Sequence, residues 1–261
     1  MNGSLHLRQS GPKAPGALSG LRVLFTGAAG GLGHGTTLAL LASGAEVFSI
    51  DRDHAHNESL RSEAHAARLH LIERDLTDTD AVRACLRDIV KGGAINVLIN
   101  NAAIYPTKPF EDFTLEEQRA VQAVNVDAAL VCTAEVLPAM RAQNWGRIIN
   151  VTSITLGGGW ENLSPYVQSK GALLGLTRAW AREFGKWGIT VNAIAPGAFP
   201  TDAERIHPDP EAYNRFVLDH QAVKRRGTPN DIAAAVMFLA SDGAGFITGQ
   251  NIAVDGGWSM N

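Results

Sequence analysis

A short apolar segment runs directly into a glycine-rich turn at residues 21–33, which read LRVLFTGAAGGLG. The apolar part predicts a buried strand at residues 21–26, and a helical pattern continues beyond the glycines to about residue 43. A second predicted strand follows at residues 46–51. In such a βαβ unit, glycines at the first strand-to-helix turn let the backbone approach a pyrophosphate at the helix N-terminus. We therefore expect a dinucleotide-binding turn that includes Gly27, Gly31, Leu32 and Gly33.

The acid that closes the second predicted strand bears on the choice of dinucleotide. The carboxylate of Asp51 can accept hydrogen bonds from both hydroxyls of an adenosine ribose at this position, and it would repel a 2′-phosphate. Arg52 complicates the prediction, because an arginine beside the ribose can bind that phosphate, although it can equally be a solvated surface residue. We predict NAD as the cofactor, in preference to NADP.

Strands and helices alternate along the rest of the chain. Five more strands are predicted, at residues 70–74, 95–100, 147–152, 189–195 and 251–254. The intervening helices include those predicted at residues 78–91, 114–140, 211–220 and 231–241. This alternation implies right-handed crossovers and a parallel sheet covered on both faces. The predicted fold class is α/β: a single-domain, Rossmann-type, doubly wound, seven-stranded parallel sheet over residues 21–261.

Composition narrows the class of protein. With 261 residues, of which 45% are hydrophobic and 19% charged, the chain can bury a large core. Its net charge of −3 predicts no nucleic-acid partner. No apolar run reaches the roughly 20 residues that a membrane span requires, so we expect no membrane partner. Cys85 and Cys132 match no metal spacing, so we expect no metal site, no disulfide and a cytoplasmic location. Residues 1–20 lack the apolar centre of a signal peptide and are predicted to form a flexible N-terminal arm.

Tyr166 and Lys170 lie four residues apart and therefore share one face of a predicted helix. A free phenol has a pKa of about 10, and an ammonium group within about 4–6 Å can lower that pKa by roughly 1–3 units. Such a pair could exchange a proton with an alcohol, although the same spacing is common on solvated helices. Ser153 follows the fifth predicted strand, at the edge where open α/β sheets bind ligands, although turns also favour serine for local reasons.

For two further polar residues, Asp75 and Asn125, the sequence allows both a structural and a functional interpretation. Asp75 follows the third predicted strand and can either cap the next helix or meet the amino group of adenine. Asn125 lies inside the helix predicted at residues 114–140, where asparagine is an indifferent helix former. A surface position would explain Asn125 as well as a functional one.

In their order along the chain, these motifs resemble those of the short-chain dehydrogenase/reductase family, over residues from about 18 to 258. Residues 26–33, TGAAGGLG, match the family's TGxxxGxG, and residues 100–103, NNAA, resemble its NNAG. The remaining matches are Asp75-Leu76 with the adenine-binding dipeptide, Pro196-Gly197 and Thr201 with PGxxxT, and residues 254–257, VDGG, with the C-terminal signature. Asn125, Ser153, Tyr166 and Lys170 match the catalytic tetrad.

The resemblance implies a set of roles. Tyr166 would be the general acid or base, Lys170 would lower its pKa and bind the nicotinamide ribose, and Ser153 would hold the substrate oxygen. Asn125 would hold a water molecule in a proton relay. The implied cofactor contacts are Gly27, Gly31, Leu32, Gly33, Asp51, Arg52, Asp75, Leu76, Asn101, Ala102, Tyr166, Lys170, Pro196, Gly197, Phe199 and Thr201. A homotetramer built through the helices after the fourth and fifth strands is also implied.

Candidate substrate contacts flank the tyrosine helix. They are Ser153, Thr155, Trp160, Glu161 and Asn162 before it, and Phe199, Asp202, Glu204, Arg205 and His207 in a lid predicted at residues 198–227. A tryptophan beside carboxylate and amide groups suits a sugar, unless Trp160 only packs the loop, whereas Arg205 and His207 could meet an anionic group. We predict an NAD-dependent oxidoreductase for a sugar or polyol, and most specifically an aldose 1-dehydrogenase.

Three alternatives stay open at this point. Two are enzymes, a 3-oxoacyl-carrier-protein reductase and a secondary-alcohol dehydrogenase. The third is a regulator that binds NAD without turnover, although such proteins typically lack the tyrosine or the lysine that this chain retains at Tyr166 and Lys170.

Overall fold

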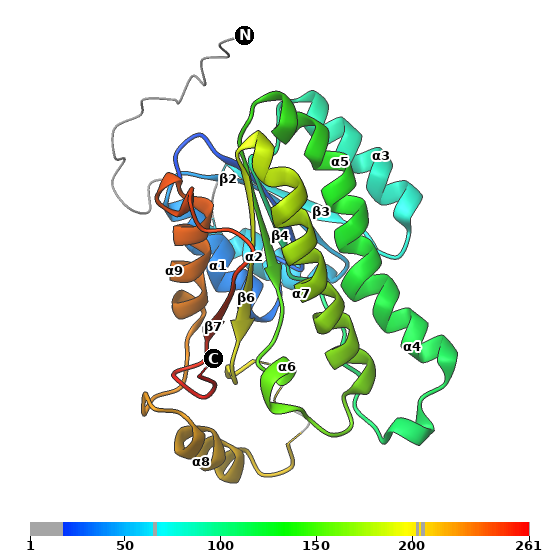
Figure 1. Cartoon of the computed structure of the whole chain (residues 1–261), viewed down its shortest axis with the longest axis vertical. Coiled ribbons are helices and arrows are strands. Elements are labelled where there is room, and N and C mark those ends of the chain that lie inside the picture. The colour runs from blue at the N-terminus through cyan, green and yellow to red at the C-terminus, as the bar shows by residue number, and fades with distance from the viewer. Residues whose placement is uncertain (1–17, 65–66, 202–203, 205–206, 261) are drawn as a thin grey trace.

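Seven strands form one parallel sheet in the computed structural model, which describes residues 18–64, 67–201, 204 and 207–260. The strands are β1 (Arg22–Thr26), β2 (Glu46–Asp51), β3 (Leu69–Glu73), β4 (Val97–Asn100), β5 (Gly146–Val151), β6 (Ile189–Pro196) and β7 (Asn251–Val254). Their order is β3-β2-β1-β4-β5-β6-β7, so the strand order reverses beside β1. In such sheets ligands bind at this reversal, beyond the carboxyl ends of the strands. The predicted Rossmann-type fold is confirmed (Figure 1).

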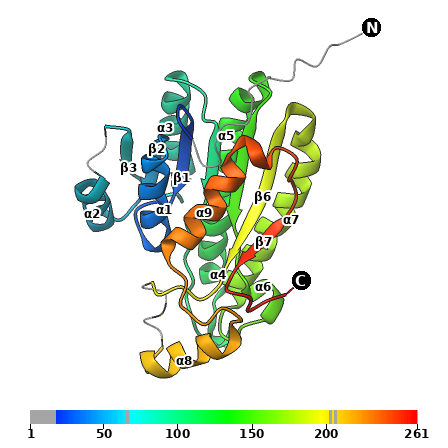
Figure 2. The same ribbon diagram turned by 90° about the vertical axis from the view of Figure 1, so that its left-hand side faces the viewer.

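Helices cover both faces of the sheet (Figures 1 and 2). They are α1 (Gly31–Ala42), α2 (His54–Ala64), α3 (Thr79–Lys91), α4 (Leu115–Gln122), α5 (Ala128–Ala142), α6 (Thr155–Gly158), α7 (Ser164–Phe184), α8 (Pro210–His220) and α9 (Pro229–Ala240). Leu40 of α1 and Val236 of α9 share one apolar core with the sheet, and Figure 2 shows these two helices side by side. Leu86 of α3, Val131 of α5 and Trp180 of α7 share a second core on the other face. Burial of these two helix layers holds the strand ends in place.

The strands predicted after residue 51 agree with the structure to within two residues, but the helices differ in two respects. The short helices α2 and α6 were not predicted; α2 buries only Asn57 and Leu60 and therefore has little apolar periodicity. The helix predicted at residues 114–140 divides into α4 and α5 around a π-helical turn, Ala123–Asp127. Asn125 lies in this turn, and single π-helical turns are frequent at functional sites.

The last part of the predicted N-terminal arm belongs to the folded domain. Leu18 is fully buried in the core beneath α1 and α9. Its amide donates a hydrogen bond to the carbonyl oxygen of Ser43 at 3.0 Å. The arm predicted at residues 1–20 therefore does not extend to residue 18, and residues 1–17 lie outside the described part of the chain.

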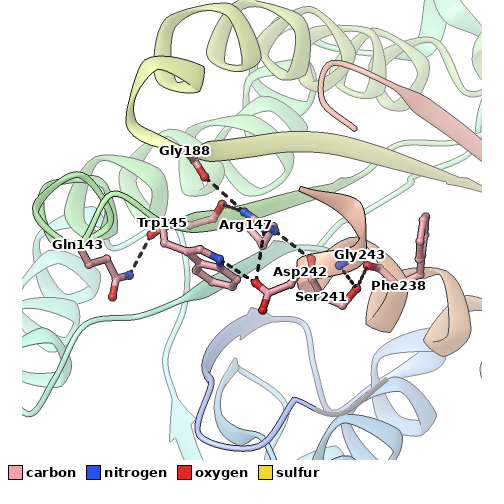
Figure 3. A network of polar contacts seen from close by, with 9 residues as sticks. Gln143, Trp145, Arg147, Gly188, Phe238, Ser241, Asp242 and Gly243 are labelled. Carbon is pink, nitrogen blue, oxygen red and sulfur yellow. Dashed lines mark hydrogen bonds and ion pairs between the residues drawn. The ribbon is translucent and has the colours of Figure 1, made fainter. Parts of the chain in front are cut away.

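A buried arginine joins the amino end of β5 to neighbouring elements (Figure 3). Arg147 Nε donates to the carbonyl oxygen of Ser241 after α9 at 3.3 Å, and Nη1 donates to that of Gly188 before β6 at 3.4 Å. Its guanidinium carbon lies 4.3 Å from the centre of the Trp145 ring. Burial lowers the pKa of Arg147 to about 10, and the nearby Asp242 carboxylate opposes this effect. The network holds the amino ends of β5 and β6 in place, at the end of the sheet opposite the cavity side.

The helical stretch Leu115–Ala142 is long and apolar enough, by length and composition alone, to cross a membrane, which the sequence analysis did not recognise. Half of its most apolar window is buried inside the fold. Val131, Cys132 and Val136 of this stretch pack in the core that α3 and α7 share. It therefore behaves as the core helix of a globular domain.

Candidate active site

A cavity of about 480 Å³ lies along the carboxyl ends of the strands. Its walls come from the glycine-rich turn after β1, from the ends of β2, β4, β5 and β6, and from the first turns of α7. Of the predicted cofactor residues only Gly33 lies outside its lining, so residues that are far apart in the sequence meet here as expected. The cavity is the candidate active site.

Glycines shape the turn after β1. A Cβ atom on Gly33 would lie 2.2 Å from the carbonyl oxygen of Gly27, so Gly33 lets α1 pack closely on the turn. A Cβ atom on Gly27 would lie 2.8 Å from Cα of Ala102 in the loop after β4. Gly31 has a φ of +47°, a conformation that favours glycine, and Gly30 gives α1 no side-chain cap. A helix N-terminus without a cap keeps N–H groups for an anion, so this turn fits the pyrophosphate of a dinucleotide.

Asp51 lies beside the turn at the end of β2. Its Oδ2 accepts a hydrogen bond from the amide of Ala29 at 3.3 Å, and its Oδ1 accepts one from the amide of Asp53 at 3.1 Å. These two bonds hold the carboxylate against the cavity, where a dinucleotide on the glycine-rich turn would place its adenosine ribose. Arg52 lines the same part of the cavity.

Asp75 also lines the cavity, and the structure excludes one of its two interpretations. Its Oδ1 accepts hydrogen bonds from the amide and the hydroxyl of Thr77, at 2.9 and 2.8 Å, which hold the pKa of Asp75 below its usual range. The N-cap of α3 is Asp78, whose side chain accepts from the amide of Ala81. The helix-cap interpretation of Asp75 is therefore wrong.

Three residues of the predicted tetrad meet at one end of the cavity. Ser153, at the end of β5, hydrogen-bonds the phenol of Tyr166 from the first turn of α7. The Nζ atom of Lys170 lies 5.4 Å from the centre of the Tyr166 ring and donates to the carbonyl oxygen of Val151 at 2.7 Å. Ser153 and Lys170 are buried. The strand-end position of Ser153 and the four-residue spacing on α7 thus produce the predicted cluster.

The electrostatics of this cluster differ from the prediction. Burial raises the pKa of Tyr166, its hydrogen bond with Ser153 lowers that pKa by less, and the neighbouring Tyr105 raises it further. Burial also lowers the pKa of Lys170 to about 7, so its amine is not a permanent cation at neutral pH. The lowered phenol pKa predicted from the Tyr166–Lys170 spacing is not found, because burial outweighs the hydrogen bond.

Asn125 joins the loop after β4 to α7. Its Oδ1 accepts from the amide of Ile104 at 2.8 Å, and its Nδ2 donates to the carbonyl oxygen of Ile104 at 3.0 Å. The same Nδ2 donates to Oγ of Ser169 at 2.9 Å, and this hydroxyl donates to the carbonyl oxygen of Tyr166 at 2.7 Å. The fourth tetrad residue therefore holds backbone that carries Tyr166, and its interior position in the helix is explained.

The predicted substrate residues divide into three groups. Those that line the cavity are Ser153, Thr155, Trp160, Phe199, Glu204 and His207. Glu161 and Asn162 are not brought to the cavity, because the turn before α7 directs them elsewhere: Asn162 has a φ of +63°, and its carbonyl accepts from the amide of Lys108 at 3.1 Å. Asp202 and Arg205 lie outside the described residues.

The segment predicted as a lid carries α8 (Figure 1), and Phe199, His207 and Tyr213 of its described part line the cavity. Arg226 holds this segment together: it forms an ion pair with Glu204, donates to Oδ1 of Asn214 in α8 at 3.2 Å, and donates to the carbonyl oxygen of Ala198 after β6 at 3.4 Å. The positive charge of Arg226 therefore neutralises the Glu204 carboxylate at the cavity wall.

Comparison with known proteins identifies the family. A sequence profile described as "Enoyl-(Acyl carrier protein) reductase" matches residues 27–259. The chain is 35% identical to 3-oxoacyl-[acyl-carrier-protein] reductase FabG of Thermotoga maritima over 244 residues, which cover 92% of this chain and 98% of that protein. The chain belongs to the short-chain dehydrogenase/reductase family. D-xylose 1-dehydrogenase of Caulobacter vibrioides is 34% identical over 244 residues, which cover 93% of this chain and 97% of that protein.

A solved structure of the family agrees in fold. The crystal structure of gluconate 5-dehydrogenase from Burkholderia cenocepacia, in complex with NADP and tartrate, has a TM-score of 0.86 at 30% identity and covers 94% of this chain and 97% of that one. Members of the family are oxidoreductases that act on CH–OH groups, and this chain is an enzyme of that class. The glycine-rich turn and the cavity beside it fit the nicotinamide dinucleotide that such enzymes use.

Several polar or aromatic side chains that line the cavity of this short-chain dehydrogenase/reductase were not predicted from the sequence, among them His56, Arg74, Tyr105 and Tyr213. Tyr105 follows β4 and meets Tyr166 edge-on, with ring centres 6.1 Å apart, so the strand-end rule that found Ser153 could also have found it. Tyr213 of α8 stacks on His207 with ring centres 3.6 Å apart. His56 lies on α2, whose weak apolar pattern gave no signal.

Proposed function

We propose that the enzyme uses NAD to oxidise a hydroxyl group of a sugar or polyol, and most specifically an aldose at C1. The observation that carries the proposal is one continuous cavity, which joins the glycine-rich turn and Asp51 to the pair Ser153 and Tyr166. Trp160 and Thr155 line the same cavity and offer an aromatic face and a hydroxyl group to a sugar. The similarity to D-xylose 1-dehydrogenase supports this substrate class.

The proposed roles follow from the geometry of the cluster. Ser153 and Tyr166 hold the substrate oxygen, and Tyr166 takes its proton in oxidation or supplies a proton in reduction. Lys170, which donates to the carbonyl oxygen of Val151, binds the nicotinamide ribose, and Asn125 orders the backbone that carries Tyr166 and holds a water molecule of a proton relay. When bound, the nicotinamide exchanges a hydride with the substrate carbon. Burial raises the pKa of the Tyr166 phenol, which favours the neutral form that donates a proton in the reductive direction.

The preference for NAD rests on Asp51. Its carboxylate is held at the cavity by the amides of Ala29 and Asp53, and it can accept hydrogen bonds from ribose hydroxyls. The crystal structure of the related gluconate 5-dehydrogenase is a complex with NADP, and calorimetric titration of this enzyme with NAD and NADP distinguishes the two cofactors.

A 3-oxoacyl-carrier-protein reductase is the second candidate, because the chain is 35% identical to such an enzyme. A carrier protein is acidic and needs a basic docking surface, whereas this chain has a net charge of −3. We therefore place the sugar or polyol first.

We further propose that the enzyme works as a cytoplasmic homotetramer. Leu130 lies on α5, the helix after β4 through which the family resemblance builds the tetramer, and is 40% exposed, so a second copy of the chain could cover it. Light scattering coupled to size-exclusion chromatography measures the mass directly, and a monomeric mass would refute the tetramer.

A substrate screen tests the proposed activity. Initial rates of NADH formation are measured across aldoses, sugar acids, polyols and secondary alcohols, and acetoacetyl-CoA is tested in the reductive direction. We expect turnover with at least one aldose and little with the thioester. Activity confined to acyl thioesters would show that the second candidate is correct.

Replacement of the proposed acid/base tests the mechanism. Tyr166→Phe is expected to lower kcat by about a hundredfold or more, because the proton donor and acceptor is lost, while NAD binding stays unchanged. Gln168→Ala, at an exposed position of the same helix, is the matched control and should keep full activity. If Tyr166→Phe retains a kcat close to that of the wild type, the assignment is wrong.

A further inference from the structure

Trp160, which lines the cavity, packs against a second tryptophan that does not. The second is Trp258, which follows β7. The centres of the two indole rings lie 5.7 Å apart, and the ring planes are inclined by 46°. Aromatic pairs stabilise one another at centre-to-centre distances of about 4.5–7 Å. Trp258 therefore contacts Trp160 from outside the cavity.

The chain before Trp160 does not fix the orientation of its ring. Three consecutive glycines, at residues 157–159, precede it, and glycine gives the backbone more conformational freedom than any other residue. A Cβ atom on Gly158 would lie 2.5 Å from Cζ3 of Trp160, so the indole occupies the space that a side chain at Gly158 would fill. The glycines thus leave room for the ring, whereas Trp258 supplies a side chain that packs against it.

The turn that carries Trp258 is itself fixed by a buried carboxylate. Asp255 accepts hydrogen bonds from the amide of Gly257 at 2.9 Å and from the amide of Ser259 at 2.8 Å. The hydroxyl of Ser259 donates to the same carboxylate at 2.6 Å. Because these bonds involve the residues on both sides of Trp258, they hold its backbone in one position.

Helix α8 packs on the ring of Trp258. His220 stacks on this ring with centres 5.0 Å apart, and Phe216 meets it edge-on with centres 5.6 Å apart. His220 Nδ1 also forms a hydrogen bond of 2.8 Å with the carbonyl oxygen of Phe216. Trp258 therefore connects Trp160 at the cavity wall to α8 and to the turn after β7.

We propose that Trp258 is a positioning residue, which holds the indole of Trp160 at the cavity wall and thereby strengthens substrate binding. The inference rests on the proposed function, in which the face of Trp160 contacts a sugar. Trp258 does not line the cavity, so its effect passes through Trp160. Loss of Trp258 should therefore raise the KM for the sugar and leave kcat nearly unchanged, which is the signature of a lost binding contact.

Steady-state kinetics with D-xylose and NAD test this role. We expect Trp160→Ala to raise the KM for D-xylose by about tenfold and Trp258→Ala to raise it by about fivefold, within the range of one aromatic contact. In both variants kcat, and the affinity for NAD measured by calorimetry without sugar, should stay within about twofold of the wild type. Trp187→Ala is the matched control, because Trp187 is also half-buried, lies under Arg141 and does not line the cavity. It should leave the KM unchanged.

The double variant Trp160→Ala/Trp258→Ala separates positioning from a general structural role. If Trp258 acts through Trp160, the two effects are not additive, and the KM of the double variant stays within about twofold of that of Trp160→Ala. A KM raised by about fiftyfold, the product of the two single effects, would overturn the proposal. So would an unchanged KM in Trp258→Ala, or a loss of NAD affinity as large as the loss for D-xylose.

Two further variants complete the test. Trp258→Phe keeps an aromatic ring and should return the KM to within about twofold of the wild type, and a KM as high as that of Trp258→Ala would contradict the aromatic contact. If Trp258→Ala does not fold, as judged by circular dichroism, Trp258→Leu fills more of the space without an aromatic face and takes its place in the double variant.

Failure of the proposed function would give a different result. A wild-type enzyme that leaves D-xylose unreacted and reduces acetoacetyl-CoA would show that the sugar assignment is wrong. The same set of variants, measured with acetoacetyl-CoA, then tests Trp258 separately: non-additive effects on its KM would support the positioning role, and additive effects would overturn it.

Discussion

Replacement of Asn125 by alanine tests whether this side chain holds the active-site backbone in place. Asn125 makes three hydrogen bonds: two with the amide and carbonyl of Ile104, and one with the hydroxyl of Ser169. The side chain is 2% exposed and lies in the π-helical turn between α4 and α5. Alanine removes all three bonds and leaves a small void beside α7.

The size of the effect follows from these contacts. A buried polar group that loses its partner costs about 1–3 kcal/mol. Ile104 lines the cavity and its two bonds to Asn125 are only partly buried, so the lower end of that range applies to its two groups. The hydroxyl of Ser169 keeps its bond to Tyr166 and loses one contact. We therefore expect the free energy of unfolding to fall by about 3 kcal/mol, which corresponds to a decrease of about 6–12 °C in Tm.

Thermal unfolding followed by circular dichroism measures this change. Asn125→Asp keeps an acceptor for the amide of Ile104 but loses both donations, so it should fall between the wild type and Asn125→Ala. Asn230→Ala is the surface control, because Asn230 is exposed on α9, and it should shift stability by less than about 0.5 kcal/mol. A Tm of Asn125→Ala within about 2 °C of the wild type would refute the argument that this residue clamps the loop after β4 to α7.

Three more substitutions test other parts of the structure. Asp51→Ala should shift the ratio of NADP to NAD affinity towards NADP by about tenfold, and an unchanged ratio in calorimetry would mean that Asp51 does not face the ribose. Arg147→Lys should lower the free energy of unfolding, measured by urea denaturation, by about 2 kcal/mol. The reason is that one ammonium group cannot donate to the carbonyl oxygens of both Ser241 and Gly188 as the guanidinium group does. A loss below about 0.5 kcal/mol would contradict this. Hydrogen bonds from Arg225 and Thr228 hold the pKa of the Asp231 carboxyl well below its usual value. The ionised carboxylate therefore stabilises the folded state at any pH above the unfolded pKa of about 3.9. This stabilisation is lost as the pH falls towards the lower pKa of the folded state. The Tm difference between the wild type and Asp231→Asn should therefore be present at neutral pH and shrink below about pH 4, and a difference that is independent of pH would contradict the assignment.

Local patterns predicted most of the fold because they act within a few residues. The run LRVLFTGAAGGLG specifies a buried strand and a turn that only glycine accommodates at Gly27 and Gly33, where a Cβ atom would collide with backbone. Strand-end positions then identified Ser153 and Asp51, because all the strands are parallel and their carboxyl ends meet at one edge. The spacing of Tyr166 and Lys170 required only the geometry of one helix.

Features that depend on distant partners were not predictable in this way. The π-helical turn at Ala123–Asp127 lets Asn125 reach both Ile104 and Ser169, and neither partner is near it in the sequence. Leu18 is buried because it completes a core formed by α1 and α9, although the residues around it are typical of a flexible arm.

The amino-acid sequence alone determined the enzyme class of this chain, because its glycine-rich turn and the residues Asn125, Ser153, Tyr166 and Lys170 match the motifs of the short-chain dehydrogenase/reductase family in their order along the chain. The tertiary structure decided which side chains share the cavity: it brought in His56, Arg74 and Tyr105 and left out Glu161 and Asn162. It also decided the direction of the pKa shifts in the central pair, because burial raises the pKa of the Tyr166 phenol and lowers that of the Lys170 amine. Burial depends on every element packed around a side chain, so its electrostatic effect cannot be found from the spacing of two residues.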